Sequence, residues 1–551
     1  SLSRSTRYPL RVSGLVSFIY IGDGNIWSIG DEMKTILLTI VAIAASTLDT
    51  SAHPLTNAQI SNATFDRYIN ANSILMIVSN DGLYATDRSG LFGYYVGMFY
   101  PYTSVGSILD GSEVASPLYS AGLWLGGKVG GETRVTVAEF ASEFWPGPMV
   151  AGTFLPYADT AAEFRVYQLY CDSLEDNPNI DYLDWPSAYG AAVDSFGKPI
   201  LRGEQTLWSV FNDANPTTHI VNAGASAPLG IEVGQTTWAS SAPGYERIIF
   251  LQYELYNKGN ETITDMYLGF FYDPDIGGAS DDLTGCDSIN QTFFSYNGDN
   301  DDYQYGSYPP ALGFRLIHGP VVPSVGDSAW YFGEITEGFK ALPLASYVAY
   351  PNGDDPQSAT ESYNLLQGFN RNGTPLANGT TFDYPGDPVI GTGDLDQNPG
   401  NPHGVGACGP FTFEPGDSQS VLLKIGVGQG NNRLASVANL RAILTSSDSI
   451  IDNRDKTLPR NFELFQNYPN PFNGNTIIRY DIVLRSFVTI EIFNILGQRV
   501  RTLVSRYHSR GRYRADWDGA DTHGRQLASG VYYYCLRAGE NIAVEKMVLL
   551  K

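Results

Sequence analysis

NYPNPFNGNTIIRY, residues 467–480, crowds three asparagines and two prolines into its first seven residues and then alternates apolar and polar positions. Asparagine and proline favour turns, because Asn side chains bond to nearby backbone groups and Pro presets φ. Alternation with a period of two is typical of a half-buried strand. The stretch therefore predicts a sharp turn that opens a β domain near the end of the chain.

The segments after this turn continue the strand pattern. Short strands are predicted in FVTIEIFNILG, RVRTLV, RYRADWDG, GVYYYCLRAG and NIAVEKMVLLK. About six or seven strands at regular spacing are typical of a small antiparallel sandwich. In GVYYYCLRAG the period of two places Tyr532, Tyr534 and Leu536 on one face and Cys535 on the other, so Cys535 is not expected in the core.

Four segments of this tail resemble the C-terminal (type A) sorting domain of cargo proteins of the type IX secretion system of the Bacteroidetes and related bacteria. The resemblance covers Leu458 to Lys551, and the segments are LFQNYPNPFN, IFNILGQRV, WDGADTHGRQLASGVYYYCLRAG and KMVLLK. It implies an Ig-like domain related to the flagellar hook-capping fold. It also implies recognition by the outer-membrane translocon and the surface-attachment machinery, often with cleavage of the domain.

The composition of the whole chain favours an all-β protein of several domains. Its 551 residues are 43% hydrophobic, 13% aromatic and only 17% charged, with 58 glycines and 31 prolines. A chain this apolar is not disordered, and one this rich in turn formers is not mainly helical. We expect one or two antiparallel β-sandwich domains, followed by the small Ig-like sandwich.

The net charge of -24 is unevenly distributed, with +5 on Leu458–Lys551 and -29 on the rest. Strong negative charge argues against binding to nucleic acid or to an anionic membrane through a general electrostatic field. Divalent cations are the partners that it favours.

The organisation along the chain predicts export. MKTILLTIVAIAASTLDTSAHP, from Met33, has a basic start, a short apolar run and small residues at a cleavage site, so residues 33–52 are expected to be a secretory signal peptide. An apolar run of about ten residues is too short to span a bilayer, and no other stretch is long and apolar enough. Residues 1–32 are expected to be upstream sequence, with a genuine extension as the alternative. The remaining divisions are a β-rich cargo region at 53–445, a linker at 446–460 and the sorting domain at 461–551.

Within the cargo region, local patterns predict individual elements. RIIFLQYELYN and DMYLGFFYD are expected to be neighbouring strands joined by a turn, and SQSVLLKIGVGQG a late strand of another sandwich. ASVANLRAILTSSD is expected to be a helix, with apolar residues at helical spacing: Val437, Leu440 and Leu444. A disulfide between Cys286 and Cys408, or free buried thiols, both remain open.

The segment FYDPDIGGASDDLTGCDSINQTFFSYNGDNDD concentrates acidic residues without a Lys or Arg. Ca²⁺ takes about 6–8 oxygen ligands in flexible geometry, and the glycines would let the backbone turn around it. The segment does not fit the EF-hand loop, and a solvated acidic loop remains the alternative. The predicted calcium ligands are Asp273, Asp275, Asp281, Asp282, Asp287, Asp299 and Asp301, with Asp302 as an eighth aspartate and Asp394 and Asp396 as a weaker second site.

Signals for catalysis are weak. GLWLGGKV, residues 122–129, fits GxxxxGK but has Val129 where a P-loop needs a hydroxyl, so a glycine-rich hairpin is expected. Neither HExxH nor GxSxG occurs. Glu139, Glu143 and Glu204 lie near aromatic residues but are expected to be surface carboxylates. Several cargo phrases, such as PLYSAGLWLGGKVGGETRV, are loosely similar to uncharacterised secreted proteins with the same sorting domain.

We therefore expect a secreted protein on the cell surface with a noncatalytic binding or structural role. The alternative is a polysaccharide-active hydrolase or a carbohydrate-binding protein, because acidic and aromatic residues suit both. A cleft with facing carboxylates and an aromatic floor would favour the hydrolase.

Overall fold

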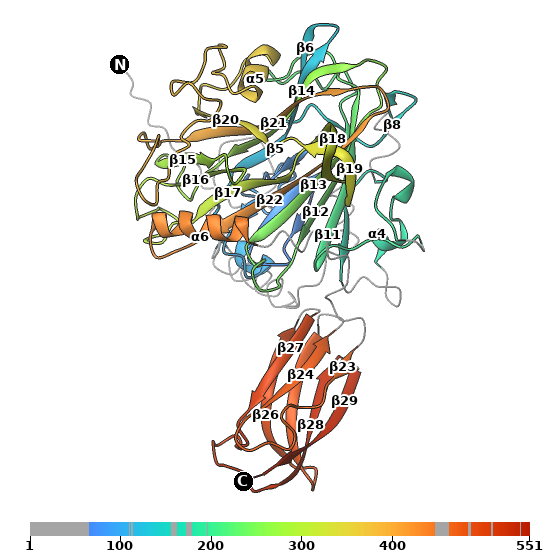
Figure 1. The fold of residues 1–551 in the computed structure, drawn as a ribbon, viewed down its shortest axis with the longest axis vertical. Coiled ribbons are helices and arrows are strands. Elements are labelled where there is room, and N and C mark those ends of the chain that lie inside the picture. Colours follow the sequence, from blue (N-terminus) through green and yellow to red (C-terminus); the bar gives the residue numbers. More distant parts are fainter. Residues whose placement is uncertain are drawn as a thin grey trace, which may run out of the picture.

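The computed structural model describes residues 66–109, 111, 114–155, 162–171, 179–194, 197–446, 462–482, 486–508, 511–539 and 541–550. The predicted signal peptide, the upstream residues 1–32 and nearly all of the predicted linker lie outside the described residues. The described chain is mostly β, and its strands pair antiparallel (Figure 1), which confirms the predicted fold class.

The first of two large sheets has nine strands. They are β1 (Asp66–Ile69), β2 (Leu75–Ser79), β3 (Leu83–Tyr84), β4 (Met98–Phe99), β5 (Ser120–Val129), β6 (Glu132–Val137), β14 (Ile263–Asp273), β20 (Leu344–Pro351) and β21 (Pro402–Phe413). Their order is β1-β2-β3-β5-β14-β21-β20, with β4 beside β2 and β6 beside β5. The segment 122–129 lies in the β5–β6 hairpin, as predicted.

The second large sheet also has nine strands. They are β7 (Trp145–Pro146), β10 (Tyr167–Tyr170), β11 (Gln205–Asn212), β12 (Ile231–Ala239), β13 (Ile248–Asn257), β15 (Asp282–Asp287), β16 (Thr292–Asn297), β17 (Ala311–His318) and β22 (Ser418–Gly428). Their order is β10-β11-β12-β13-β22-β17-β16-β15, with β7 beside β11.

The two large sheets share one apolar core and form one sandwich. Phe270 of β14 and Tyr253 of β13 are both fully buried, and their rings stack across the interface at 6.4 Å. The same core cluster extends from Ile69 to Val427. The described part of the cargo region is therefore one sandwich rather than two.

Two predicted strand relations are wrong. β13 and β14 are consecutive along the chain but lie in different sheets, because each strand has both of its edges occupied by other partners. β22 does not belong to another sandwich; it lies between β13 and β17 in the second sheet. Alternation identifies a strand but contains no information about its partner.

Helices cover the outer faces of the sandwich (Figure 1). α6 (Arg433–Thr445) packs on the second sheet through Val437, Leu440 and Leu444, as predicted. α5 (Ala359–Leu366) packs on the first sheet. Its close approach requires Gly269 of β14, where an added Cβ would lie 2.3 Å from Leu366.

Smaller elements complete the cargo region. They are α3 (Val105–Leu109), α4 (Ile180–Leu183), a 3-10 turn at Ser187–Tyr189, the ribbon of β8 (Met149–Val150) with β9 (Thr153–Phe154), and the ribbon of β18 (Val321–Tyr331) with β19 (Glu334–Ala341).

The C-terminal unit is a second, smaller sandwich. Its strands are β23 (Glu463–Leu464), β24 (Thr476–Ile482), β25 (Ser486–Asn494), β26 (Arg499–His508), β27 (Gly511–Trp517), β28 (Gly530–Ala538) and β29 (Asn541–Leu549). A sheet of order β23-β24-β27 packs on one of order β26-β25-β28-β29, around its own core of residues from Leu464 to Leu549.

The turn at 467–473 is bound into this smaller sandwich. The backbone N–H of Phe472 donates to the carbonyl of Val548, and the N–H of Leu550 donates to the carbonyl of Phe472. The Phe472 ring is buried and lies 5.5 Å from that of Trp517. The turn therefore adds a short parallel pairing to β29, which the alternating pattern did not predict.

All four cysteines are free and buried, so the predicted alternative of unpaired thiols is the one observed. The period of two in β28 is confirmed, because Tyr532, Tyr534 and Leu536 belong to the core and Cys535 does not. Cys535 is nevertheless only 5% exposed, and its cross-strand neighbours on the same face are Glu491 of β25 and Val544 of β29.

We predict that Leu366→Ala lowers the free energy of unfolding of the large sandwich by about 2–5 kcal/mol, because it leaves a cavity beneath α5. Leu183→Ala is a matched control, since Leu183 is 66% exposed, and a change within about 0.5 kcal/mol is expected there. Urea denaturation of both variants tests this. Equal effects of the two substitutions would contradict the packing of α5.

Candidate functional site

A pocket of about 370 Å³ opens at one end of the first sheet, where β5, β14, β21 and β20 run side by side. Asp273 ends β14 and pairs with Ser120 at the start of β5. His403 lies at the start of β21 and pairs with Tyr350 of β20. Antiparallel pairing thus brings the ends of these four strands close together. The lining residues are Tyr119, Phe140, Asp273, Asp275, Asn352, Asp355, Asn401 and His403.

Strand alternation places this pocket on the outer face of the sheet. Phe271 comes two residues before Asp273, and Val405 two residues after His403. Both belong to the apolar cluster beneath α5. Because side chains two apart along a strand share a face, Asp273 and His403 project outward with them, away from the central core.

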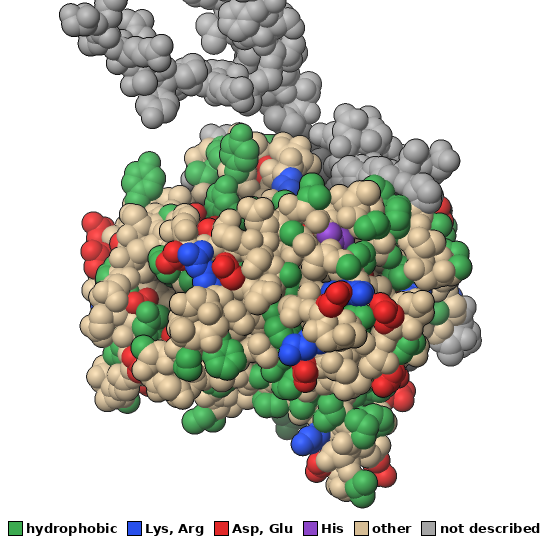
Figure 2. Space-filling view, turned by 90° about the horizontal axis from the view of Figure 1, so that it is seen from above, with side chains coloured by type: hydrophobic (Ala, Val, Ile, Leu, Met, Phe, Trp, Pro, Cys, Tyr) green, Lys and Arg blue, Asp and Glu red, His purple; other side chains and the backbone are tan. Residues whose placement is uncertain are grey.

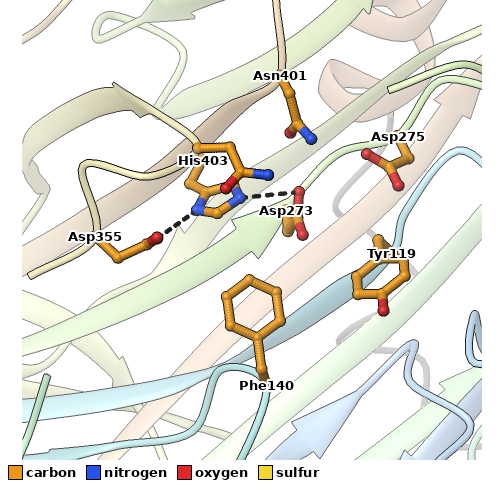
Figure 3. Close-up of a pocket in the computed structure, with 8 residues that line it drawn as sticks. Tyr119, Phe140, Asp273, Asp275, Asp355, Asn401 and His403 are labelled. Atoms are coloured by element: carbon orange, nitrogen blue, oxygen red, sulfur yellow. Dashed lines mark hydrogen bonds and ion pairs between the residues drawn. The ribbon is translucent and has the colours of Figure 1, made fainter. Parts of the chain in front are cut away.

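His403 lies between two carboxylates (Figure 3). Its Nδ1 is 2.7 Å from Oδ1 of Asp355, which is a hydrogen bond. Its Nε2 is 3.4 Å from Oδ1 of Asp273, an ion-pair distance without hydrogen-bond geometry. Asp355 therefore orients the imidazole toward Asp273.

Aromatic rings shield this histidine from water. The ring of His403 lies 5.5 Å from that of Phe140, 6.0 Å from Phe271 and 5.6 Å from Tyr350. His403 is only 2% exposed as a result. Electrostatic interactions are stronger in such a water-poor environment than at the open surface.

Burial and charge shift the pKa values of the pocket residues. Burial alone lowers the pKa of His403, but the hydrogen bond to Asp355 and the charge of Asp273 outweigh it, so the net shift is upward. The hydrogen bond to His403 lowers the pKa of Asp355. Burial raises the pKa of Asp273 to about 7 and that of Asp275 to about 6, although the charge of His403 opposes both shifts.

Several acceptor atoms in the pocket have no hydrogen-bond partner. They are Oδ1 of Asp273, Oδ1 of Asp275 and Oδ1 of Asn401, and all three are buried. Asp273 is only 5% exposed. Most buried polar atoms in proteins are paired, so this concentration of unpaired oxygens can accept hydrogen bonds from a ligand or coordinate a cation.

The structure distributes the seven aspartates predicted to bind calcium. Asp273 and Asp275 line the pocket. Asp282 is fully buried, and its Oδ2 accepts a hydrogen bond from the N–H of Ile276. The eighth, Asp302, accepts backbone hydrogen bonds from Gln304 and Tyr305 of its own loop and from Gly278 of the segment after β14. The others do not line the pocket: Asp281, Asp287, Asp299 and Asp301. Calcium binding by this whole segment stays a prediction.

The weaker second acidic segment folds against the first one. Asp396 is buried, and its Oδ2 accepts a hydrogen bond from the N–H of Thr284, whereas Asp394 is exposed. Among the residues that the structure describes, no group of three or more His, Cys, Asp or Glu side chains is arranged to hold a metal ion.

The predicted surface positions of two glutamates are wrong. Glu143 is fully buried, and its carboxylate accepts hydrogen bonds from the N–H groups of Val221 and Ala225. Glu139 is 9% exposed and lies beside the pocket, where burial and the charge of Asp355 raise its pKa to about 8. Sequence context alone does not distinguish a surface glutamate from a buried one.

His403, Asp355 and Asn401 are among the pocket residues that sequence reasoning missed. They lie more than 80 residues from Asp273 along the chain, and no motif connects them. The weak local signal was NPHG at 401–404, a lone histidine after a turn and before a strand. Only the pairing of β14 with β21 brings it to Asp273.

On the face drawn in Figure 2, acidic and basic side chains are scattered among polar and apolar ones, without a broad basic patch. Within the described ranges, every helix is too short or too polar to cross a bilayer.

Residues 485–541 match the FlgD Ig-like domain family. The match lies within the smaller sandwich, from the start of β25 to the start of β29. A search of curated proteins finds no match to the chain.

Three solved structures are distantly similar. A polysaccharide lyase is similar over 58% of this chain and 34% of its own, with 9% identity and a TM-score of 0.19. PorZ of Porphyromonas gingivalis, described as a surface component of the type-IX secretion system, is similar over 66% and 46%, with 10% identity and a TM-score of 0.14. Latent PorU of the same organism is similar over 64% of this chain and 33% of its own, with 11% identity and a TM-score of 0.14. The chain thus spans from about a third to under half of these proteins, and scores this low support no inference.

We predict that Glu139→Gln makes folding stability less sensitive to pH. The folded pKa of Glu139, about 8, lies above its unfolded value of 4.5, so the folded state binds more protons between these values. Stability from this group is therefore lost as pH rises from about 4.5 through 8. The variant should match the parent near pH 5 and exceed it at pH 9 by about 2 kcal/mol or more.

Urea denaturation at both pH values tests this prediction. Glu334→Gln is the matched control, because Glu334 is exposed on the β18–β19 ribbon. A stability difference between Glu139→Gln and the parent that does not change with pH would contradict the burial of this carboxyl.

Proposed function

We propose that this protein is a cargo of the type IX secretion system, and that its C-terminal sandwich is the signal for passage through the outer membrane and attachment to the cell surface. The observation that carries the proposal is the FlgD Ig-like match at 485–541. The sorting-domain motifs at 464–473 and 546–551 flank that match. A signal peptide at 33–52 would supply the first step, export to the periplasm.

The way in which the turn segment is bound supports this assignment. The hydroxyl of Tyr534 donates to the carbonyl of Phe465 and accepts from the N–H of Asn467. The Asn467 amide donates to the hydroxyl of Thr476. The motif therefore stabilises the folded shape of the sandwich, and a receptor that recognises this shape would depend on it.

In this proposal the large sandwich is the part displayed outside the cell, with a noncatalytic binding role. The acidic pocket on its outer face supports such a role, because it combines unpaired oxygens with aromatic walls. Calcium bound by the acidic segment and a surface polysaccharide are the ligands proposed from composition. The negative charge of this region argues against nucleic acid as a partner.

We predict that deletion of Leu458–Lys551 leaves the protein exported across the inner membrane but retained in the periplasm. The reason is that the signal peptide remains while the proposed recognition domain is lost. Fractionation of the native host, with the full chain as reference, measures this.

The converse experiment uses a reporter. A periplasmic reporter protein fused to residues 458–551 should reach the cell surface or the medium, whereas a fusion that carries Phe472→Ser should be retained, because it disrupts the buried turn. Normal surface levels of the truncated protein would contradict the sorting assignment.

The pocket favours a second candidate function, a polysaccharide-active hydrolase. Such enzymes use one carboxylic acid as a proton donor and a second carboxylate as base or nucleophile. Asp273, with a pKa of about 7, would be protonated in about half of the molecules at neutral pH, while Asp275, with a pKa of about 6, would be mostly ionised. Phe140 and Tyr119 supply aromatic walls.

Release of reducing ends from a panel of bacterial and plant polysaccharides tests this second candidate. A hydrolase should release reducing ends from at least one polysaccharide. The rate of release should fall at least about a hundredfold in Asp273→Asn and stay unchanged in Asp301→Asn. Asp301 is the matched control because it is an exposed aspartate of the same segment. No release by the parent protein on any polysaccharide of the panel would count against a hydrolase.

A further inference from the structure

Three of the four buried lining atoms without a hydrogen-bond partner are oxygens. Oδ1 of Asp273, Asp275 and Asn401 are acceptors, and the fourth atom is Nε2 of His403. In Figure 3 these three side chains surround a common space beside His403. A ligand that satisfies them must bring either hydrogen-bond donors or positive charge.

The charge of the pocket decides between these possibilities. Its lining includes three carboxylates and one imidazole but neither Lys nor Arg. An anion would be repelled here. A neutral saccharide could donate hydrogen bonds to the oxygens, but it would leave three carboxylates with only the imidazole of His403 as a countercharge, which is costly in a water-poor site. A cation satisfies the oxygens and the charge together.

We propose that this pocket binds a divalent cation of the calcium type through Asp273, Asp275 and the amide oxygen of Asn401. Ca²⁺ accepts carboxylate and amide oxygens in flexible geometry and completes its shell of about 6–8 ligands with water. Two carboxylates and one amide are a small set of protein ligands, so water fills the remaining positions. The volume of about 370 Å³ leaves room for that water.

His403 and Asp355 are positioning residues in this proposal. Asp355 accepts a hydrogen bond from Nδ1 of His403, which directs Nε2 toward Asp273. The imidazole therefore restricts the orientation of one proposed ligand, the Asp273 carboxylate. The proposed site includes only part of the acidic segment, because Asp287, Asp299 and Asp301 do not line the pocket.

Terbium luminescence and calcium calorimetry on the purified full chain test the site. Tb³⁺ prefers the same oxygen ligands, and Tyr119 in the lining can sensitise its emission on excitation near 280 nm. We expect Tb³⁺ emission that Ca²⁺ displaces, and calcium binding that raises the melting temperature by mass action. The affinity for Ca²⁺ should fall at least tenfold in Asp275→Asn and in Asn401→Ala. Asn401→Ala removes an oxygen ligand without removing a charge.

Asp301→Asn is the matched control, because it removes the same charge from the acidic segment outside the pocket. It should bind Ca²⁺ as the parent does, and melting without Ca²⁺ verifies that each variant is folded. Lack of Ca²⁺ binding by the parent at millimolar concentration would overturn the proposal. So would equal loss of affinity in Asp301→Asn and Asp275→Asn, or no loss in Asp275→Asn. The inference does not depend on the export route, which cell fractionation tests separately.

Discussion

The position of β14 between β5 and β21 is the constraint on which the rest of the large sandwich depends. One face of β14 directs Phe270 and Tyr272 into the core shared with the second sheet. The other face directs Phe271 toward the cluster beneath α5. Both edges of the strand are hydrogen-bonded, so it cannot shift its register without exposing both sets of side chains.

The same register determines the chemistry at the end of the strand. Once β14 is fixed, Asp273 is held beside His403 of β21, and the loop after β20 brings Asp355 to the other side of the ring. Asp273 and His403 are therefore held by paired strands, whereas the other lining residues lie in the segments next to strand ends. Rigid strand ends can keep carboxylates buried and close together, although their mutual repulsion disfavours such an arrangement.

How much of this was predictable differs between the two sandwiches. The smaller one depends on local signals, since turn residues and a period of two identify its strands, and its motifs are contiguous. The helix at Arg433–Thr445 was equally local, because Val437, Leu440 and Leu444 lie on one face. In contrast, β13 and β14 have clear strand patterns but belong to different sheets, because pairing between distant strands leaves no local trace.

The acidic site shows the same limit. The composition singled out Asp273 and Asp275, which line the pocket, together with several aspartates of the same segment that lie elsewhere. The missing partners, Asn401, His403 and Asp355, are distant in sequence and of ordinary residue types. Their role becomes visible only through burial and unpaired atoms, which are properties of the folded chain.

The most direct measurement of the central claim is a crystal structure of the full chain grown with calcium, with anomalous scattering used to locate the ion. The account predicts one ion in the pocket at the end of the first sheet, coordinated by oxygens of Asp273, Asp275 and Asn401 at about 2.3–2.6 Å. A pocket in which these oxygens bond only to water or to each other, with calcium absent or bound elsewhere, would contradict it.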